Sequence, residues 1–339
     1  MRHLELSDGC DILLVHRASF FEKTTVEALH GTPSLTAPQD LSSYRKVFVH
    51  FLSPTVCGWI AKHPGLRFYW ILYGSDVYRN PLVKTQFLLP GSHSYVQGNI
   101  TDRLRWLAYR LLKARDWKQA LKQVHTVLTS TPSEFDEISR LIPIQQAETS
   151  RFFYGKSLLD AEDTKPPLEL RNRLPLQMML GHCAYPSLNH ADFLLAQPER
   201  PDLVHWHLPL TYGDAKYRAW LTEKFKDRTD VTMYTKHWPI DEYHEWIAQL
   251  HGAVFHNIRP QGLANFHALI SLGKPVFLNE NNVVRPYYEE SGLFLPGSHQ
   301  FHDLHTEVLS AEKWKGNKAA LQSIWNMKIC RELYRSNFS

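Results

Sequence analysis

The densest group of residues that could do chemistry lies in segment 253–282, AVFHNIRPQGLANFHALISLGKPVFLNENN. The pattern predicts a strand, a polar loop containing Gly262, a helix, and a second strand. The amino end of such a helix attracts anions, because its unpaired N–H groups and its dipole both favour negative charge. Arg259, Gln261 and Asn265 would add side-chain donors. The segment predicts a diphosphate site, with an ordinary glycine-capped turn as the equally weighted alternative.

A second group of polar residues follows another predicted strand. Gly181 precedes the loop HCAYPSLNH, which supplies Ser187, Asn189 and His190 just before a predicted helix at 191–196. Hydroxyl, amide and imidazole groups in such a loop could hold phosphate oxygens. The alternative is a well-capped start of a helix.

Two further strand ends in the same half carry candidate ligand contacts. Pro209 and Tyr212 could pack on a thymine base, although an ordinary turn explains them equally well. Glu280 and Asn281 end a strand at its carboxyl edge, where ligands of open α/β sheets usually bind.

The first half of the chain offers candidates for a general base. Asp76 follows a predicted strand, and His50 and His16 end two others. A displacement at a sugar carbon needs a group that removes the proton of the attacking hydroxyl, and a carboxylate or histidine suits that role. We rank Asp76 first, followed by His50 and His16, with a satisfied polar role at a strand end as the alternative for each.

Several common site motifs are absent from the sequence. It contains no G-x-G, no phosphate loop, no G-x-S-x-G and no D-x-D. The closely spaced pairs His205/His207 and His302/His305 lack a third plausible ligand. We therefore expect no cofactor and no metal.

Composition and charge favour a soluble two-domain protein. The 339 residues are 43% hydrophobic and 21% charged, and the net charge of +4 is too small to indicate nucleic-acid binding. Four widely separated cysteines indicate a reducing compartment, and the N-terminus lacks a secretory signal, so we expect a cytoplasmic location.

Short apolar runs alternate with helical patterns, which predicts buried parallel strands in βαβ units. The charged, proline-containing segment 160–175 is the best linker, so we predict an N-terminal domain at 1–165 and a C-terminal domain at 166–339, with a helix at 311–334 free to pack back on the first. The expected strands are 11–16, 47–51, 67–73, 124–128, 176–180, 204–208, 231–234, 253–256 and 275–278, and further helices are expected at 132–141 and 263–272.

A basic amphipathic helix is predicted over 103–122. Its leucines recur at helical spacing and its polar face is almost wholly cationic, with Arg105, Arg110, Lys113 and Lys122 among the basic residues. Such helices bind anionic membrane surfaces, and an ordinary solvated helix face is the equal alternative.

Several stretches resemble one enzyme family. The late strand, glycine loop, helix and G-x-P-V pattern resembles the donor domain of GT-B glycosyltransferases, which have two Rossmann-like α/β domains and an interdomain cleft. More narrowly, the chain resembles glycosyltransferase family 56, the 4-acetamido-4,6-dideoxygalactose or "4-alpha-L-fucosyltransferase" family of enterobacterial common antigen synthesis. The matching stretches are FYWILYGSDVY (68–78), LGHCAYPSLNHAD (180–192), LPLTYG (208–213), 261–276 and LNEN (278–281).

The resemblance implies an inverting, metal-independent transfer from a dTDP-sugar to a polyprenyl-diphosphate-linked saccharide at the inner face of the cytoplasmic membrane. Retaining GT-B families carry a glutamate where this chain has His267-Ala268, and no acid lies between Gly262 and Gly273. This departure argues against the retaining families. The alternatives are a non-catalytic protein that binds a sugar nucleotide or glycan on the same fold, and a soluble transferase that acts on a protein or small molecule.

Overall fold

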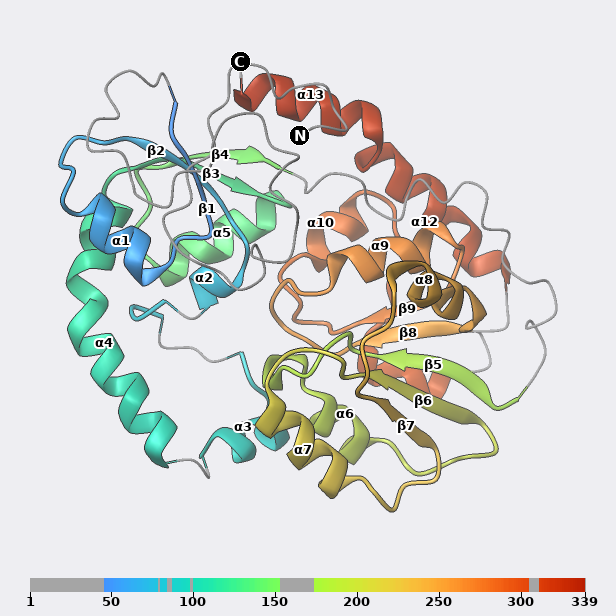
Figure 1. Cartoon of the computed structure of the whole chain (residues 1–339). Helices are drawn as coiled ribbons and strands as arrows, with labels where there is room; N and C mark the ends of the chain where they lie inside the picture. Colours follow the sequence, from blue (N-terminus) through green and yellow to red (C-terminus); the bar gives the residue numbers. More distant parts are fainter. Residues whose placement is uncertain are drawn as a thin grey trace. The chain divides into compact units, whose positions relative to one another are not determined.

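The computed structural model describes residues 46–78, 80–83, 87–97, 100–152, 174–304 and 311–338 (Figure 1). The chain divides into two compact units, each with its own parallel sheet. Unit 1 comprises residues 1–85, 105–155 and 327–339, and unit 2 comprises residues 86–104 and 156–326. Residues 86–104 therefore belong to unit 2, although most of that unit comes later in the chain. Residues 327–339 belong to unit 1, although the rest of that unit comes much earlier.

Unit 1 is built on a four-stranded parallel sheet whose order follows the sequence, β1-β2-β3-β4. The strands are β1 (Phe48–His50), β2 (Phe68–Ile71), β3 (Val124–Thr129) and β4 (Glu148–Arg151). The accompanying helices are α1 (Pro54–Ile60), α2 (Ser75–Tyr78), α4 (Ile100–Leu121, in this unit from residue 105), α5 (Pro132–Leu141) and α13 (Met327–Phe338). Tyr334 of α13 packs with Ile71, Leu128 and Phe152, so the end of the chain completes this core.

Unit 2 is built on a five-stranded parallel sheet of order β7-β6-β5-β8-β9. The strands are β5 (Leu176–Leu180), β6 (Val204–Pro209), β7 (Val231–Tyr234), β8 (Gly252–Phe255) and β9 (Val276–Leu278). The helices are α3 (Pro90–Gln97), α6 (His190–Ala196), α7 (Ala215–Lys224), α8 (Ile240–Gln249), α9 (Leu263–Ser271), α10 (Arg285–Glu290), α11 (Phe301–Leu304) and α12 (Ala311–Ile324).

The strand order places the helices on opposite faces of this sheet. Right-handed crossovers from β5 to β6 and from β6 to β7 put α6 and α7 on one face, and the reversed direction puts α8 and α9 on the other (Figure 1). The central strand β5 shows the consequence. Met178 and Leu180 join the cluster that contains Trp206, whereas Tyr243 of α8 lies against Met179. Leu176, Met178, Met179 and Leu180 are apolar because both faces of the strand are covered, and the one polar residue, Gln177, pairs its Oε1 with His207 Nε2 (2.7 Å).

The carboxylate of Asp192 caps α3 and holds it in unit 2. Asp192 accepts hydrogen bonds from the backbone N–H groups of Gly91 and Ser92 and from the hydroxyl of Ser92 (2.6 Å). A carboxylate at the first turn of a helix satisfies donors that lack an intrahelical partner. Residues 86–104 are tied to unit 2 in this way.

The structure corrects two expectations about secondary structure. The helix predicted at 311–334 is two helices: α12 ends at Ile324 and α13 begins at Met327, with the buried Trp325 between them, its ring 4.0 Å from that of His267. The polar strand β4, ETSR, was not predicted, since it lacks the apolar run of a central strand and lies at the edge of its sheet. The predicted linker 160–175 lies outside the described residues up to position 173.

Candidate functional site

The sheet of unit 2 has a topological switch point between β5 and β8. The connection after β5 leads toward β6, and the connection after β8 leads toward β9 in the opposite direction. Loops that follow the two strands diverge there, which leaves room at the carboxyl edge, and ligands of open α/β sheets bind at this point. The loops after β5 and β8 are the two that the sequence predicts to bind phosphate.

The loop after β8 presents the amino end of α9. Gly262 is the N-cap residue with φ 71°, a left-handed conformation that favours glycine, and no side chain caps the helix. Its carbonyl accepts the first helical hydrogen bond from Phe266 N (2.9 Å). The first N–H groups of α9 therefore lack a side-chain partner, which is the arrangement that favours an anion.

Gln261 joins the two loops. Its Oε1 accepts a hydrogen bond from Ser187 Oγ (2.8 Å) in the loop after β5 and another from Arg259 Nε (2.7 Å). Arg259 is buried, and its carbonyl accepts a hydrogen bond from Asn257 Nδ2 (2.7 Å). Three of the residues predicted for donor binding thus meet at one side-chain oxygen beside α9.

In the loop after β5, three of the predicted residues make contacts within the protein, namely Gly181, Asn189 and His190. Gly181 has φ 65°, and a Cβ there would collide with the ring of His190, which is fully buried. Asn189 accepts a hydrogen bond from Leu89 N (3.0 Å) and donates to His256 O (3.3 Å). These contacts fix the shape of the loop, whereas Ser187 points to the amino end of α9 through Gln261.

The remaining predicted contacts lie around this edge. Pro209 is buried at the end of β6, and Tyr212 is 51% exposed with its ring 6.3 Å from that of His182. Glu280 and Asn281 are exposed after β9, and Glu280 lies 3.0 Å from His299 Nδ1. Of these four predicted residues, Tyr212 is the one with an accessible aromatic ring.

Asn265 connects the site to α8. Its Oδ1 accepts a hydrogen bond from Tyr243 Oη (3.2 Å). Tyr243 belongs to a ring cluster with Trp238 and Trp246, at centroid distances of 5.9 and 5.5 Å. The sequence did not single out this cluster, because aromatic residues at helical spacing are equally typical of a core.

The structure separates the base candidates of unit 1. Asp76 is 2% exposed and accepts hydrogen bonds from Leu52 N (3.2 Å), Tyr73 N (3.2 Å) and Trp70 Nε1 (2.8 Å). Burial raises the pKa of Asp76 to about 6 despite these donors. His50 is exposed at the end of β1, with its ring 5.8 Å from that of Tyr73.

Desolvation by its neighbours lowers the pKa of His50, so its ring is neutral near pH 7 and can accept a proton. His16 lies outside the described residues. Glu134, in the first turn of α5, is a buried carboxylate that was not among the predicted site residues. Burial raises its pKa to about 7, and Ser130 N donates to it (3.0 Å).

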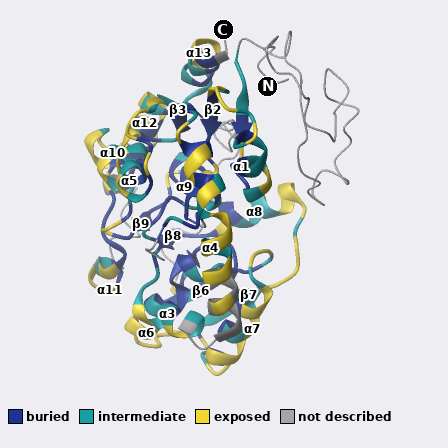
Figure 2. Cartoon of the chain, turned by 90° about the vertical axis from the view of Figure 1, so that its left-hand side faces the viewer, coloured by how far each residue is buried: buried dark blue, intermediate teal, exposed yellow. Residues whose placement is uncertain are grey.

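The basic helix is present as α4, and much of it is exposed (Figure 2). Four of its leucines, Leu104, Leu107, Leu111 and Leu112, are 61%, 53%, 75% and 75% exposed, whereas Leu121 at its end is buried. Among the predicted membrane contacts, Lys113 and Lys122 are exposed and Arg110 donates to Pro81 O (2.9 Å), whereas the side chain of Arg105 lies outside the described part of the helix. Trp117 is buried and Trp106 is not described.

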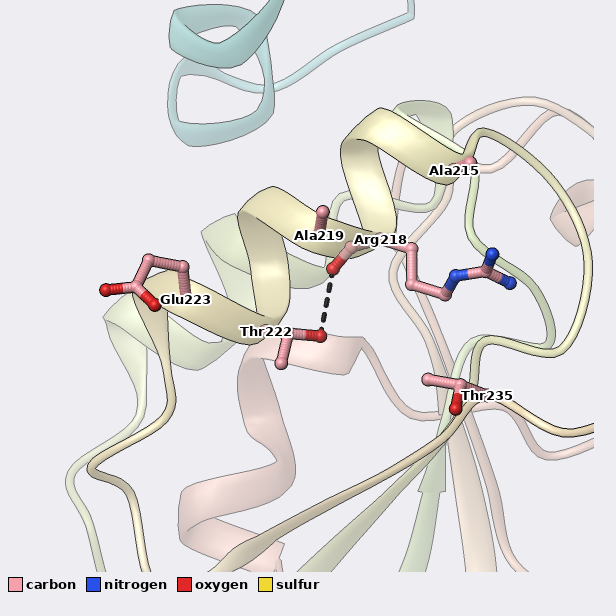
Figure 3. Close-up of a pocket in the computed structure, with 6 residues that line it drawn as sticks. All are labelled: Ala215, Arg218, Ala219, Thr222, Glu223 and Thr235. Carbon is pink, nitrogen blue, oxygen red and sulfur yellow. Dashed lines mark hydrogen bonds between the residues drawn. The ribbon is translucent and has the colours of Figure 1, made fainter.

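Other kinds of site are not visible in the described residues. No group of three or more His, Cys, Asp or Glu side chains there could hold a metal ion. Within the same ranges, none of the helices combines the length and apolar character needed to span a bilayer. A shallow depression over α7 and the end of β7 (Figure 3) contains none of the residues predicted for donor binding, and is lined by Ala215, Arg218, Ala219, Thr222, Glu223 and Thr235.

Comparisons with known proteins show similarity of structure. No protein-family model matches the sequence, and no curated protein matches it. The structure of HepE from Anabaena, in complex with UDP and glucose, aligns with a TM-score of 0.61 and 11% identity over 99% of this chain and 93% of that one. Sucrose-phosphate synthase from Thermosynechococcus elongatus aligns with a TM-score of 0.57 and 16% identity over 86% of this chain and 73% of that one.

The N-terminal domain of a trehalose-6-phosphate phosphatase from Candida albicans aligns with a TM-score of 0.55 and 11% identity over 99% of this chain and 90% of that one. At such low identities the likeness establishes the fold and leaves the activity open. The two Rossmann-like units and these alignments show that the chain has the α/β fold of the GT-B glycosyltransferases.

Proposed function

We propose that the chain is a glycosyltransferase that uses a nucleoside-diphosphate sugar, with inversion and without a metal ion. The observation that carries this proposal is the amino end of α9 at the switch point of unit 2, with Arg259 and Ser187 joined to it through Gln261. When the bond between the sugar and the diphosphate breaks, negative charge develops on the leaving phosphate. Fixed N–H donors and a guanidinium group stabilise that charge where another enzyme would use a metal.

The surroundings of His267 support inversion. His267 occupies the position where retaining families place a glutamate, and here it is buried, with Nε2 2.7 Å from Tyr288 Oη. A side chain held in this way serves the packing of α9. The proposal therefore uses direct displacement, in which a base of unit 1 removes the acceptor proton. We assign this role to His50 first, with Asp76 second, because a base must be accessible to the hydroxyl that it deprotonates.

The finer part of the proposal concerns donor and acceptor. We infer a deoxyamino sugar on dTDP, or a related nucleotide sugar, and a polyprenyl-diphosphate-linked saccharide as acceptor. The resemblance of five stretches to family 56 supports both. The exposed leucines of α4, with the exposed Lys113 next to them and the exposed Lys122 just after the helix, support an anionic membrane surface as partner, and hence a place on the inner face of the cytoplasmic membrane.

A non-catalytic binding protein on the same fold is the second candidate. A domain named for a phosphatase shares the fold, so the fold alone does not define a transferase. A soluble transferase with a protein or small-molecule acceptor is the third. Turnover of the donor separates the first two candidates, and binding to vesicles separates the first from the third.

The deciding experiment measures binding of dTDP, UDP, GDP and ADP to the full chain by calorimetry in excess EDTA. We expect one of them to bind, and a saturating ligand at 100 times its Kd to raise the unfolding free energy by about 2.7 kcal/mol. Arg259→Ala should weaken that binding by about 1.5–3 kcal/mol, because a charge-assisted hydrogen bond is lost. Arg140→Ala is the matched control, since Arg140 makes an exposed ion pair with Glu137 in unit 1.

Donor hydrolysis or transfer in the same EDTA buffer completes the test. Activity that disappears with EDTA and returns with magnesium or manganese contradicts the metal-free mechanism. Binding without any turnover supports the non-catalytic candidate. Equal affinity of wild type and Arg259→Ala removes Arg259 from the site.

A further inference from the structure

A buried imidazole nitrogen lies against the amino end of α9 without a hydrogen-bond partner. His182 follows Gly181 in the loop after β5 and is 8% exposed. A Cβ added to Gly262, the N-cap of α9, would lie 2.5 Å from His182 Nδ1. Nδ1 is one of the buried side-chain atoms without a partner in the described part of the chain. A buried polar atom without a hydrogen-bond partner destabilises the fold, so its presence here requires an explanation.

The neighbouring cysteine determines which ring nitrogen carries the hydrogen. His182 Nε2 lies 3.4 Å from Cys183 Sγ. Burial raises the pKa of Cys183 to about 12, so the thiol keeps its hydrogen, and the sulfur already interacts with the Tyr212 side chain and the Tyr185 backbone. We infer that the thiol donates to Nε2, which leaves the single hydrogen of the neutral ring on Nδ1, the nitrogen that faces α9.

The groups around His182 keep it neutral in the free protein. Burial, and then the positive charge of Arg259, lower the pKa of His182 to about 4. The other titratable groups that face it are Cys183, Tyr212 and His190, and burial lowers the pKa of His190 as well. His182 is therefore a neutral donor next to a guanidinium group and the start of a helix.

We propose that His182 is a residue of the donor site and that its Nδ1–H donates to a phosphate oxygen of the nucleoside diphosphate at the amino end of α9. Cys183 is a positioning residue, which fixes the tautomer through Nε2. Because Nδ1 has almost no solvent access, the proposal includes a shift of the Gly262 turn on phosphate binding. The inference rests on the proposed function and adds two residues to it.

In the transfer step, the bond between the sugar carbon and the diphosphate oxygen breaks, and its electron pair stays on that oxygen. The acceptor hydroxyl forms the new bond and gives its proton to the base of unit 1. His182 keeps its own proton throughout. Its hydrogen bond strengthens as charge develops on the leaving phosphate, which is how a preformed donor lowers a barrier.

Three variants of His182 test the position of the donor. His182→Asn places an amide N–H close to the position of Nδ1, His182→Gln places one near Nε2, and His182→Ala removes both. Calorimetry with dTDP and UDP should show affinity within about 3-fold of wild type for Asn, and a loss of about 10- to 100-fold for Gln and Ala. His205→Asn is the matched control, since His205 Nε2 contacts Thr232 Oγ1 (2.7 Å) away from the site.

The outcomes are distinct. Wild-type affinity in all three variants, with unchanged melting temperatures, overturns the role of His182. Equal losses in all three, Asn included, show that His182 serves packing and also overturn it. If wild-type protein binds no nucleoside diphosphate, the proposed function fails, and the tautomer measurement below still decides the second part of the inference.

Nitrogen-15 NMR of histidine-labelled protein reads the tautomer directly. We expect the Nδ1–H form for His182 in wild type and in Cys183→Ser, whose hydroxyl is also a donor. Cys183→Ala should shift the ring toward the Nε2–H form and weaken binding of the diphosphate by about 3- to 10-fold. An Nε2–H tautomer in wild type, or a Cys183→Ala protein with unchanged tautomer and affinity, overturns the role of Cys183.

Discussion

At the scale of single residues, burial distinguishes groups that the sequence treats alike. Asp76 and His50 both follow strands of unit 1. The carboxylate of Asp76 holds the chain after β1 and β2 through Leu52 N, Tyr73 N and Trp70 Nε1, and is closed to solvent. His50 is exposed and neutral. A buried acceptor with all its bonds made is typical of a structural group, and an accessible neutral imidazole is typical of a base.

Replacement of His50 by alanine should reduce turnover by roughly 10²–10⁴ while the donor Kd and the melting temperature stay near wild type, because proton removal is lost without a packing change. Asp76→Asn should instead lower the unfolding free energy by about 1–3 kcal/mol, since an amide N–H would face the donors that now bind the carboxylate. Turnover, donor affinity and chemical unfolding of both variants provide the check.

The reverse pattern assigns the base to Asp76. A stable Asp76→Asn protein with strongly reduced turnover, together with a normal His50→Ala protein, would restore the ranking that the sequence suggested. His125→Ala is a suitable control, because His125 is a partly exposed histidine of the same unit whose Nδ1 contacts the neighbouring Thr126 hydroxyl (2.8 Å).

At the scale of elements, α4 differs from an ordinary surface helix. Its carboxyl end packs normally through Trp117, Ala120 and Leu121, which are buried. Upstream of that end the leucines that should cover a core are exposed to solvent, and the exposed Lys113 and Arg115 follow them. An apolar stripe with a basic border fits the interface of an anionic bilayer.

Vesicles rich in phosphatidylglycerol should co-sediment with the protein at low salt. Charge reversal of Lys113 and Lys122 should weaken this binding by about 1 kcal/mol per residue near the surface, an effect that is screened by about 0.5 M salt. Replacement of Leu107, Leu111 and Leu112 by serine should weaken binding at every salt concentration, because burial of apolar side chains depends little on ionic strength.

The control is charge reversal of Lys226 and Lys318, which are exposed on unit 2 and should leave vesicle binding unchanged. Failure of the wild-type protein to bind anionic vesicles even at low salt would make α4 a solvated helix and a soluble acceptor the better proposal. Binding that survives the serine substitutions would limit the contact to charge.

At the scale of the whole molecule, the two units should respond to pH in opposite directions. In unit 1, burial raises the pKa of Glu134 from its usual 4.5 to about 7. The stability that this carboxyl group contributes is therefore fully present below pH 4.5 and is lost as the pH rises through 7. In unit 2, burial lowers the pKa of His190 and of His267 to about 3. The stability that these neutral imidazoles contribute is fully present above pH 6.5 and is lost as the pH falls.

Hydrogen exchange should reveal this difference. Between about pH 4.5 and 7.5, protection of β3 should fall by about 3 kcal/mol from Glu134 alone, and Glu134→Gln should remove that change. Protection of β5 should instead fall as the pH is lowered, by about 2 kcal/mol per buried histidine between pH 6.5 and 5. Parallel changes in both strands would contradict the assignment of these buried groups.

The sequence by itself determined the elements whose signal is local. The strands Leu176–Leu180 and Val231–Tyr234 and the helix Pro132–Leu141 occur with the predicted bounds. The central strand Leu176–Leu180 is covered on both sheet faces, and the helix begins with a proline and an acid, so both leave a pattern in the chain. The sequence also predicted Gly262 at the amino end of α9, because the strand, the glycine and the helix follow one another in the chain.

Only the tertiary structure decided which distant residues meet. Nothing local joins Ser187 to Gln261, brings His182 against Gly262, or moves residues 86–104 into unit 2 and 327–339 into unit 1. It also decided that Asp76 is buried and that four leucines of α4, upstream of its packed end, are exposed. Local patterns encode backbone conformation, whereas strand order and side-chain burial depend on contacts between segments far apart in the chain.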